Sequence, residues 1–388
     1  MQSRSMSVVS MAQHNRDLVL ELLRRAGTVS RTEVGERIGA SAATVNRLTT
    51  DLLRRGLIVD AGTAPSSGGR PAMLLRFNAE AAWTVAVDVR AHVTRAALVD
   101  LAGTVGAVAE VSADAGSRHE RVQGVVGLAA DLVRRAEAAG RRVLGVGVAV
   151  PGTVAGDGTV DWAPVLSWRQ VPLGRMIGSV TGKSVVVEND ANVLAVAEHR
   201  HGRAAGVECL VALILGNGIG AGIIVGNRLY RGTRAAAGEI GYMLTGTDSL
   251  AQTYAGFGDM ESRVGGEGIA RRSRELGLKA PAGGDPTAAD VFELARAGEP
   301  VAEQLVARVS DELAVAVANL AAVLDPDAVV LGGGIGGSAD LIVPRLATRL
   351  AGRIPFVPRL LGPSFTDGVL VGASDLALDA VGSLDAAL

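Results

Sequence analysis

The sequence has a single cysteine, and only 3% of its 388 residues are aromatic. One thiol, Cys209, can form neither an internal disulfide nor a site of several thiolate ligands, and its apolar surroundings predict a buried structural residue. No apolar run reaches the roughly 18 residues that a membrane-spanning helix needs, so we expect no membrane partner. Residues 1–13 carry one charge and lack the basic and apolar segments of a secretory signal, which predicts a cytoplasmic protein.

Lysine is also scarce, and the basic residues are unevenly spread. Residues 1–76 hold 11 Arg against 6 acidic residues, whereas the remainder carries a net charge of −7. The length exceeds what one hydrophobic core usually supports, so we expect more than one domain. A basic amino-terminal part on an acidic body predicts that a polyanion binds the first part alone.

The first eighty residues contain three short segments with apolar residues at helical spacing. These segments are 18–23, 34–38 and 45–53. Ser30 and Glu33 form a capping-box pattern that begins the second helix. Gly39 ends it, and Ser41 can cap the third helix after a tight turn. The sequence therefore predicts a helix-turn-helix.

A β-hairpin follows the third predicted helix. Residues 57–59 and 73–77 are apolar, and the breaker-rich segment 61–71 separates them. Such a hairpin is a wing, so residues 1–78 are expected to form a winged helix-turn-helix domain. From the periodicity alone, a small packing or dimerisation module is the alternative.

The third predicted helix exposes small and hydrogen-bonding residues, which let a helix sit deep in the major groove. Its far end carries arginines suited to phosphates. A further arginine between glycines at the hairpin tip can extend toward the minor groove. We therefore expect a double-stranded DNA operator to be contacted by Ser41, Ala42, Ala43, Thr44, Asn46, Arg47, Arg54 and Arg70.

The rest of the chain shows the same organisation twice, in 83–150 and again from residue 209 to residue 331. Two α/β lobes that face each other leave a cleft, where ligands usually bind. We expect the first lobe over 83–190, with a carboxyl-terminal helix at 371–388 packing back on it. The second lobe is expected over 191–370.

Polar and glycine-rich segments follow strands of both lobes. The turn 216–222 has four glycines and could cradle an anion, with a tight hairpin turn as the alternative. The matching turn of the first lobe, 88–93, has no glycine. The segment 188–192 places carboxylates and amides at a strand's carboxyl end, with helix capping as the alternative. Glu239 lies between glycines, where a surface loop is the alternative.

Together these segments resemble the ROK family, named for repressors, open reading frames and sugar kinases, whose regulators carry an amino-terminal winged helix. The resemblance rests on the order and separation of Val150-Pro151-Gly152, 188–192, 216–232, 238–241 and Leu331-Gly332-Gly333-Gly334. It implies an α/β fold in which a two-lobed body of the actin and hexokinase type follows the head. It also implies that residues 332–334 lie where a kinase holds adenosine.

The resemblance also assigns roles within the cleft. Sugar hydroxyls would be bound by Asn189, Asp190, Glu239, Tyr242 and Glu261. A vestigial phosphate loop would comprise Gly216, Gly218 and Gly220. In the family's kinases the acid that matches Asp190 deprotonates the sugar hydroxyl, so Asp190 would be catalytic if this chain were a kinase.

Departures from the family pattern argue against catalysis. The first phosphate loop normally reads Asp-x-Gly-Gly-Thr, but Val89, Arg90, Ala91 and His92 follow Asp88 here. We therefore expect no efficient use of ATP, no cofactor and no enzyme activity. The family's zinc ligands are replaced by Tyr242, Gln252, Tyr254 and Asp259, so we expect no metal. Packing of the two tyrosines is expected to hold that region, and Val165 replaces an Asn that normally contacts sugar.

These features predict a DNA-binding repressor of carbohydrate metabolism genes. A sugar or sugar-phosphate effector would change the closure of the lobes and, through it, operator binding. We expect a homodimer or homotetramer on an inverted-repeat operator, because one winged helix touches too little duplex for high specificity. Two alternatives stay open: a sugar kinase with an appended DNA-binding head, and a ligand-independent regulator with a vestigial cleft.

Overall fold

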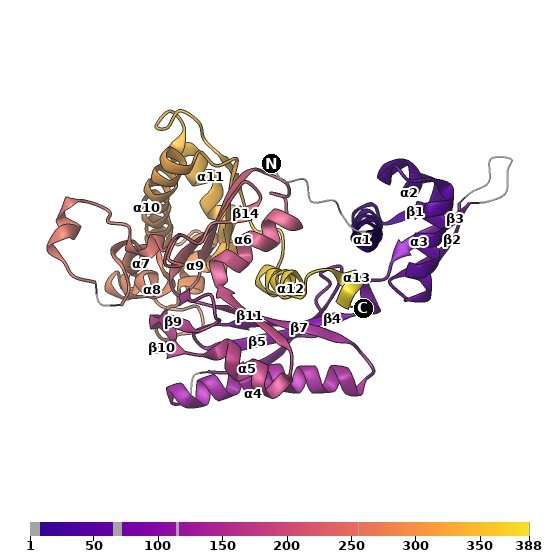
Figure 1. The fold of residues 1–388 in the computed structure, drawn as a ribbon. Coiled ribbons are helices and arrows are strands. Elements are labelled where there is room, and N and C mark those ends of the chain that lie inside the picture. Colours follow the sequence, from indigo (N-terminus) through magenta and orange to yellow (C-terminus); the bar gives the residue numbers. More distant parts are fainter. Residues whose placement is uncertain (1–7, 65–71, 114–115, 255, 388) are drawn as a thin grey trace.

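The computed structural model describes residues 8–64, 72–113, 116–254 and 256–387. A small head at the amino end lies beside a larger two-lobed body (Figure 1). Within these ranges, no helix combines the length and the apolar character needed to cross a membrane.

The head has the predicted winged helix-turn-helix architecture. Its elements are α1 (Val8–Ala26), β1 (Thr28–Ser30), α2 (Arg31–Ile38), α3 (Ala42–Arg54), β2 (Ile58–Thr63) and β3 (Met73–Phe77). The strands form an antiparallel sheet in the order β1-β3-β2. The capping box of Ser30 and Glu33 begins α2, and Gly39 ends it with a φ of 66°. The Ser41 side chain accepts a hydrogen bond from the amide of Thr44 and so caps α3.

The body contains two sheets of five strands with the same topology. The first lobe comprises β4 (Trp83–Val89), β5 (Val93–Asp100), β6 (Ala109–Ser112), α4 (Arg118–Ala138), β7 (Val143–Val150), β8 (Thr153–Val154), β9 (Val160–Ala163), β10 (Trp168–Val171), α5 (Leu173–Thr181) and β11 (Ser184–Asn189). Its large sheet has the order β11-β7-β4-β5-β6. Helices α4 and α5 cover one face of this sheet (Figure 1).

The second lobe repeats this arrangement. It comprises α6 (Asp190–Arg200), β12 (Cys209–Leu215), β13 (Ile219–Val225), β14 (Arg228–Leu229), α7 (Asp259–Val264), α8 (Gly266–Glu275), α9 (Ala288–Arg296), α10 (Pro300–Leu324), β15 (Ala328–Gly332), α11 (Ala339–Leu350) and β16 (Arg359–Leu361). Read from its other edge, as β16-β15-β12-β13-β14, the strand order matches that of the first sheet position by position. The two-lobed fold expected from the repeated pattern is therefore confirmed.

Helices α6 and α12 (Gly368–Val381) lie between the two sheets and pack on each other. Helix α12 covers the inner face of the first sheet, and α6 covers the second. Glycines allow these close approaches: a Cβ at Gly147 would come within 1.9 Å of the α12 backbone, and one at Gly222 within 2.1 Å of the α6 backbone. A Cβ at Gly372 would lie 2.0 Å from the carbonyl oxygen of Val193, so the two helices touch backbone to backbone.

The expectation of one carboxyl-terminal helix over 371–388 was wrong in its bounds. Helix α12 begins at Gly368 and ends at Val381, and a short helix α13 (Leu384–Ala387) follows. Gly382 separates them with a φ of 80°, which a right-handed helix cannot continue through.

The head is joined to the body by a shared apolar core. The buried cluster built around α1, α2 and α3 also includes Ala82, Leu101 and Leu378 of the body. Helix α13 contacts α1 directly. The position of the head therefore depends on the position of α12.

Candidate functional site

Helix α3 presents a hydrophilic face at its amino-terminal end. Its buried residues are Val45, Leu48, Thr49 and Leu52. The predicted DNA contacts Ser41, Ala42, Ala43, Asn46 and Arg47 are exposed, and Thr44 is half-buried. Small exposed residues let a helix approach base edges closely. Arg70, predicted to reach the minor groove, lies outside the described residues.

Arginines gather around one carboxylate at the far end of α3. Asp51 lies 2.6 Å from Arg54, 3.8 Å from Arg55 and 4.0 Å from Arg16. The hydrogen bond from Arg54 holds the pKa of Asp51 below its usual value. Because the Arg54 side chain is 78% exposed, this pair leaves the guanidinium accessible to a phosphate. Arg16 comes from α1 and was not foreseen.

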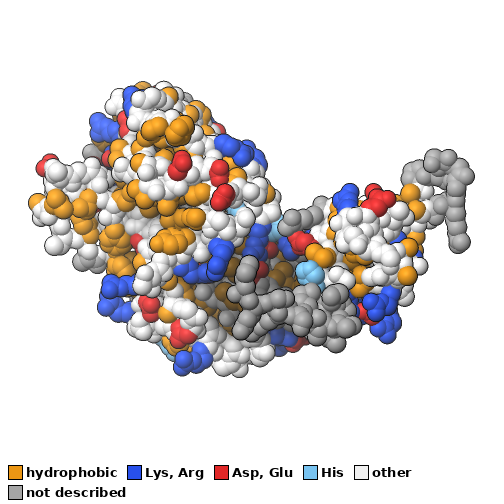
Figure 2. Space-filling view, turned by 45° about the horizontal axis from the view of Figure 1, so that its top comes forward, with side chains coloured by type: hydrophobic (Ala, Val, Ile, Leu, Met, Phe, Trp, Pro, Cys, Tyr) orange, Lys and Arg blue, Asp and Glu red, His pale blue; other side chains and the backbone are white. Residues whose placement is uncertain are grey.

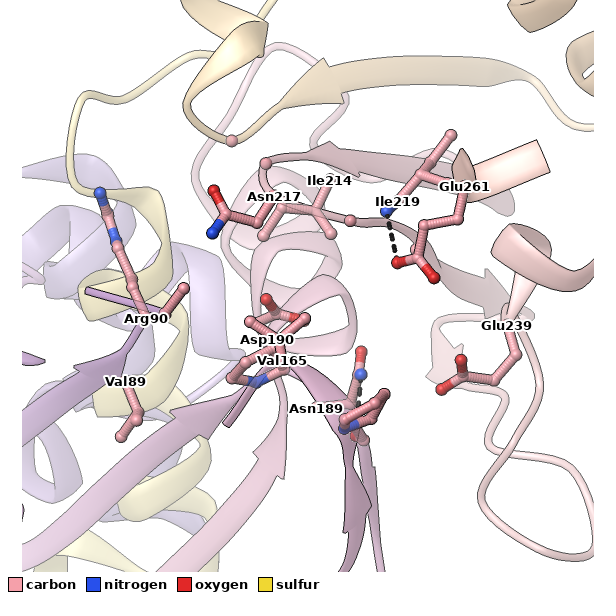
Figure 3. Close-up of a pocket in the computed structure, with 18 of the residues that line it drawn as sticks. Val89, Arg90, Val165, Asn189, Asp190, Ile214, Asn217, Ile219, Glu239 and Glu261 are labelled. Carbon is pink, nitrogen blue, oxygen red and sulfur yellow. Dashed lines mark hydrogen bonds between the residues drawn. The ribbon is translucent and has the colours of Figure 1, made fainter. Parts of the chain in front are cut away.

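The body contains a cavity of about 310 Å³ between the lobes. All five residues predicted to bind sugar line this cavity: Asn189, Asp190, Glu239, Tyr242 and Glu261. The glycines Gly216, Gly218 and Gly220 line it too. Figure 3 shows Asn189 and Asp190 on one side, Asn217 and Glu261 opposite them, and Glu239 pointing in from a third direction. The structure therefore brings together residues up to 72 positions apart in the sequence.

Asn189 and Asp190, where β11 passes directly into α6, both line the cavity, and Asn189 also caps the helix. Asn189 Oδ1 accepts hydrogen bonds from the amides of Ala191 and Asn192, and its Nδ2 donates to the carbonyl oxygen of Gly152. The capping alternative is therefore correct for Asn189. Asp190 Oδ1 accepts only from the neighbouring Ala191 amide among the described bonds, which leaves carboxylate capacity for a ligand.

An ion pair between the buried Glu188 and the partly exposed Arg231 supports this segment. Glu188 accepts a hydrogen bond of 2.6 Å from Arg231 Nε and one of 2.9 Å from Asn192 Nδ2. Sequence reasoning noted Glu188 and Arg231 only as parts of larger motifs and did not pair them. Arg231 follows β14, so the pair joins the end of β11 to the second lobe.

Carboxyl groups dominate the charge of the cavity. Burial, together with the charge of Asp88, raises the pKa of Asp190 to about 7. Burial raises the pKa of Glu261 to about 7 and also raises the pKa of Glu239. Among the residues described as lining the cavity, Arg90 is the only Arg or Lys. The site therefore offers several carboxyl groups for hydrogen bonds and little positive charge for an anion.

The turn of the first lobe is filled by its own ion pair. Arg90 contacts the buried carboxylate of Asp88 through Nε at 2.7 Å and Nη2 at 2.6 Å. His92 Nε2 and Asn217 Nδ2 are 3.3 Å apart, so this turn also meets the glycine-rich turn of the second lobe. Side chains thus occupy the space where the family's kinases have glycines.

The glycine-rich turn between β12 and β13 is a tight hairpin. The amide of Gly216 donates to the carbonyl oxygen of Gly218 at 3.0 Å, and the amide of Ile219 donates to Glu261 Oε1 at 3.2 Å (Figure 3). A Cβ at Gly218 would lie 1.9 Å from that same carboxylate oxygen. Two of the amides that could cradle an anion are therefore engaged, and an acid lies beside them.

The residues at the family's zinc positions do not suit zinc, and the described residues contain no group of His, Cys, Asp and Glu that could hold a metal. Asp259 instead accepts hydrogen bonds from Thr245, Ser249 and Arg263 at 2.6 to 3.0 Å. Burial opposes its ionisation, but these donors outweigh burial and hold the pKa of Asp259 well below its usual value. This network was missed, because only packing of tyrosines was expected to hold the region.

Aromatic rings form one wall of the cavity. Trp162 and Tyr242 both line it, with ring centroids 6.1 Å apart, and the Tyr242 hydroxyl donates to the carbonyl oxygen of Gly256. Aromatic faces suit the apolar C–H face of a sugar ring. Trp162 was not singled out from the sequence. Val165 also lines the cavity and leaves an apolar surface where the family has an amide.

Comparison with known proteins places these features in a family. The ROK family model matches residues 84–380, and a winged helix-turn-helix DNA-binding model matches residues 16–59. The xylose repressor of Caldicellulosiruptor bescii is 26% identical over 344 residues, which cover 86% of each chain. A glucokinase of Streptomyces coelicolor is 30% identical over 273 residues, covering 67% of this chain and 84% of that one.

Solved structures share the fold. A ROK family transcriptional regulator, described as a homologue of the Escherichia coli Mlc protein, covers 96% of both chains with a TM-score of 0.78 at 20% identity. A ROK family glucokinase of Streptomyces griseus, solved with glucose and AMPPNP, is 28% identical and covers 76% of this chain and 99% of its own, with a TM-score of 0.66.

Proposed function

Because the chain belongs to the ROK family and carries a winged helix-turn-helix, we propose that it is a sugar-responsive transcriptional repressor. The observation that carries this proposal is the shared core that joins a DNA-reading head to a body with a carboxylate-lined cavity. Relatives named xylose repressor, similar over 86% of the chain, support the same function. As a protein bound to DNA, it would work in the cytoplasm on genes of carbohydrate metabolism.

The effector is a sugar without a phosphate group. Asp190, Glu239 and Glu261 offer acceptors for hydroxyl groups, and Trp162 offers an apolar wall. A phosphate would meet these carboxyls, while Arg90, the only Arg or Lys among the residues described as lining the cavity, is already paired with Asp88. Each unpaired buried polar group left in such a site would cost about 1 to 3 kcal/mol, which favours a ligand with several hydroxyls.

Ligand and operator are coupled through closure of the lobes. A sugar can shift this equilibrium only by its differential affinity for the two forms, so sugar and DNA change each other's affinity by the same factor.

The test is a panel of neutral sugars, amino sugars and sugar phosphates in a thermal-shift screen. A ligand present at 100 times its dissociation constant adds about 2.7 kcal/mol of stability. Operator affinity is then measured with each ligand that binds. If the ligands bind without altering operator affinity, the protein is a ligand-independent regulator with a vestigial cleft. Val165 in place of the family's Asn supports this alternative.

A sugar kinase with an appended head is the second candidate. A carboxyl group with a pKa near 7 suits a general base at neutral pH, and Asp190 has such a pKa. Against this candidate, the Arg90–Asp88 pair and the absence of glycine in the first turn obstruct a triphosphate. Incubation with labelled ATP and the panel of sugars decides between the two, since appreciable phosphate transfer would establish the kinase.

We also propose that the repressor works as a homodimer or homotetramer on an inverted-repeat operator. Figure 2 shows apolar side chains gathered over the body, and Val323 and Phe356 are 81% and 77% exposed. Large exposed apolar residues are common at subunit interfaces. Light scattering of the protein alone and with operator DNA measures the stoichiometry, and a monomer on a single half-site would overturn this assignment.

A further inference from the structure

Two helices connect the cavity to the head. Helix α6 begins with Asp190 in the cavity wall and is followed by His201 at its far end. Helix α12 begins beside Val369, which also lines the cavity, and its last turns contain Leu378 of the head's core. Figure 1 shows α12 directed toward α13 and the head. Both helices therefore have one end at the proposed ligand and the other end near the DNA-binding unit.

A buried carboxylate near the middle of α12 contacts both the head and the residue that follows α6. Asp375 of α12 is 3% exposed, and its Oδ2 lies 2.8 Å from His201 Nε2, which follows α6. Its Oδ1 lies 3.6 Å from Arg24 Nη2 of α1. One carboxylate thus contacts the head through Arg24 and the second lobe through His201. A buried carboxylate that loses a partner is strongly destabilised, so the geometry of all three groups is linked.

The three groups belong to parts that a closure of the lobes would move differently. Helix α12 packs on the first sheet and α6 on the second, and their backbones touch where Gly372 meets Val193. A rotation of the sheets about this contact would displace the ends of the helices. The head follows α12, since the Ser383 hydroxyl donates to Asp17 of α1 at 2.9 Å. His201 follows α6 and the second lobe.

We propose that Asp375, with Arg24 and His201, is the junction that transmits lobe closure to the DNA-binding head. Closure moves His201 relative to Asp375, and the carboxylate then changes its contact with Arg24 and the attachment of α1. Asp375 is a positioning residue, because it touches neither ligand nor DNA. This inference rests on the proposed function and supplies the physical element that a coupling between the two sites requires.

The test fixes the two lobes to each other at their observed contact, without sugar or DNA. His92→Cys and Asn217→Cys in a Cys209→Ala background place two thiols across the cleft, where the native side chains lie 3.3 Å apart. A short bifunctional thiol reagent links them, and a monofunctional reagent gives the unlinked control. Hydrogen exchange followed by mass spectrometry then compares α1 in the linked and unlinked full-length protein. We expect linking to change exchange in α1 by at least about fivefold, the lower end of usual coupling between sites.

Variants of the junction decide its role. Asp375→Asn should reduce the effect of linking on α1 to less than about twofold. Asp379→Asn is the matched control, because Asp379 lies one turn further along α12 in an exposed pair with Arg200, and it should keep the full effect. Arg24→Gln tests the same junction from the partly exposed side of the head, should Asp375→Asn fail to fold.

Two outcomes would overturn the proposal: no change in α1 on linking the parent protein, or a full change in Asp375→Asn or Arg24→Gln. The proposed repressor function is judged separately, by sugar and operator binding. A failure here would therefore leave that function standing with another route of transmission.

Discussion

Replacing Asp190 with asparagine removes a carboxyl group whose pKa is raised, chiefly by burial and by the nearby charge of Asp88, from 3.8 to about 7. At about 1.36 kcal/mol for each unit of pKa, this difference corresponds to about 4 kcal/mol. Because the side chain faces the cavity and keeps some access to water, we take half of this value, about 2 kcal/mol. A raised pKa in the folded state stabilises the protein below pH 4, and this contribution is lost as the pH rises through 7.

The asparagine variant does not have this loss. Its free energy of unfolding should be close to that of the unsubstituted protein at pH 4 and should exceed it by about 2 kcal/mol at pH 8. Urea denaturation, followed by the fluorescence of Trp83, Trp162 and Trp168 in the first lobe, measures both values. Glu303→Gln, at an exposed position on α10, is the control and should show no such dependence on pH. A difference in the free energy of unfolding between variant and parent that is the same at pH 4 and pH 8 would contradict the raised pKa of Asp190.

Four further substitutions test other parts of the molecule. Arg47→Ala should weaken binding to operator DNA by about 1 to 3 kcal/mol and binding to random-sequence DNA much less, whereas Arg54→Ala should weaken both alike. Fluorescence anisotropy with operator and random-sequence DNA measures these affinities. An equal effect of Arg47→Ala on both DNAs would contradict its role. Glu239→Gln should weaken sugar binding by about tenfold and leave the operator affinity of the sugar-free protein unchanged, as calorimetry and anisotropy would measure. Asp259→Ala should lower the free energy of unfolding by about 3 kcal/mol at pH 7, because Arg263 and two hydroxyls lose their acceptor. Since the pKa of Asp259 is below its usual value, this loss should shrink as the pH falls below about 4, and a loss that persists unchanged there would exclude the network.

Local patterns in the sequence predicted local structure well. The caps at Ser30 and Ser41 and the end of α2 at Gly39 depend on neighbouring residues, so the sequence alone was sufficient. The repeated order of strands and helices likewise predicted two lobes with one topology, because each lobe uses the same alternation of apolar segments.

Interactions between distant segments could not be predicted in this way. The partners Asp375 and His201 are 174 positions apart, and Glu188 and Arg231 are 43 apart. No local pattern pairs such residues, because many acids and arginines could satisfy each other equally well. The end of α12 was misplaced for a different reason: Gly382 lies within an apolar, helix-favouring segment, yet it has a positive φ, and α13, which contacts α1, follows it.

The most direct test of the coupling between sugar binding and operator binding is a measurement of operator affinity. It is made on the full-length protein, with and without a saturating neutral sugar from the panel. We expect the sugar to change operator affinity by a factor of about 5 to 150 and operator DNA to change sugar affinity by the same factor. Weaker sugar binding by Glu239→Gln shows that the sugar occupies the cavity. If such a sugar leaves operator affinity unchanged, the two sites are not coupled.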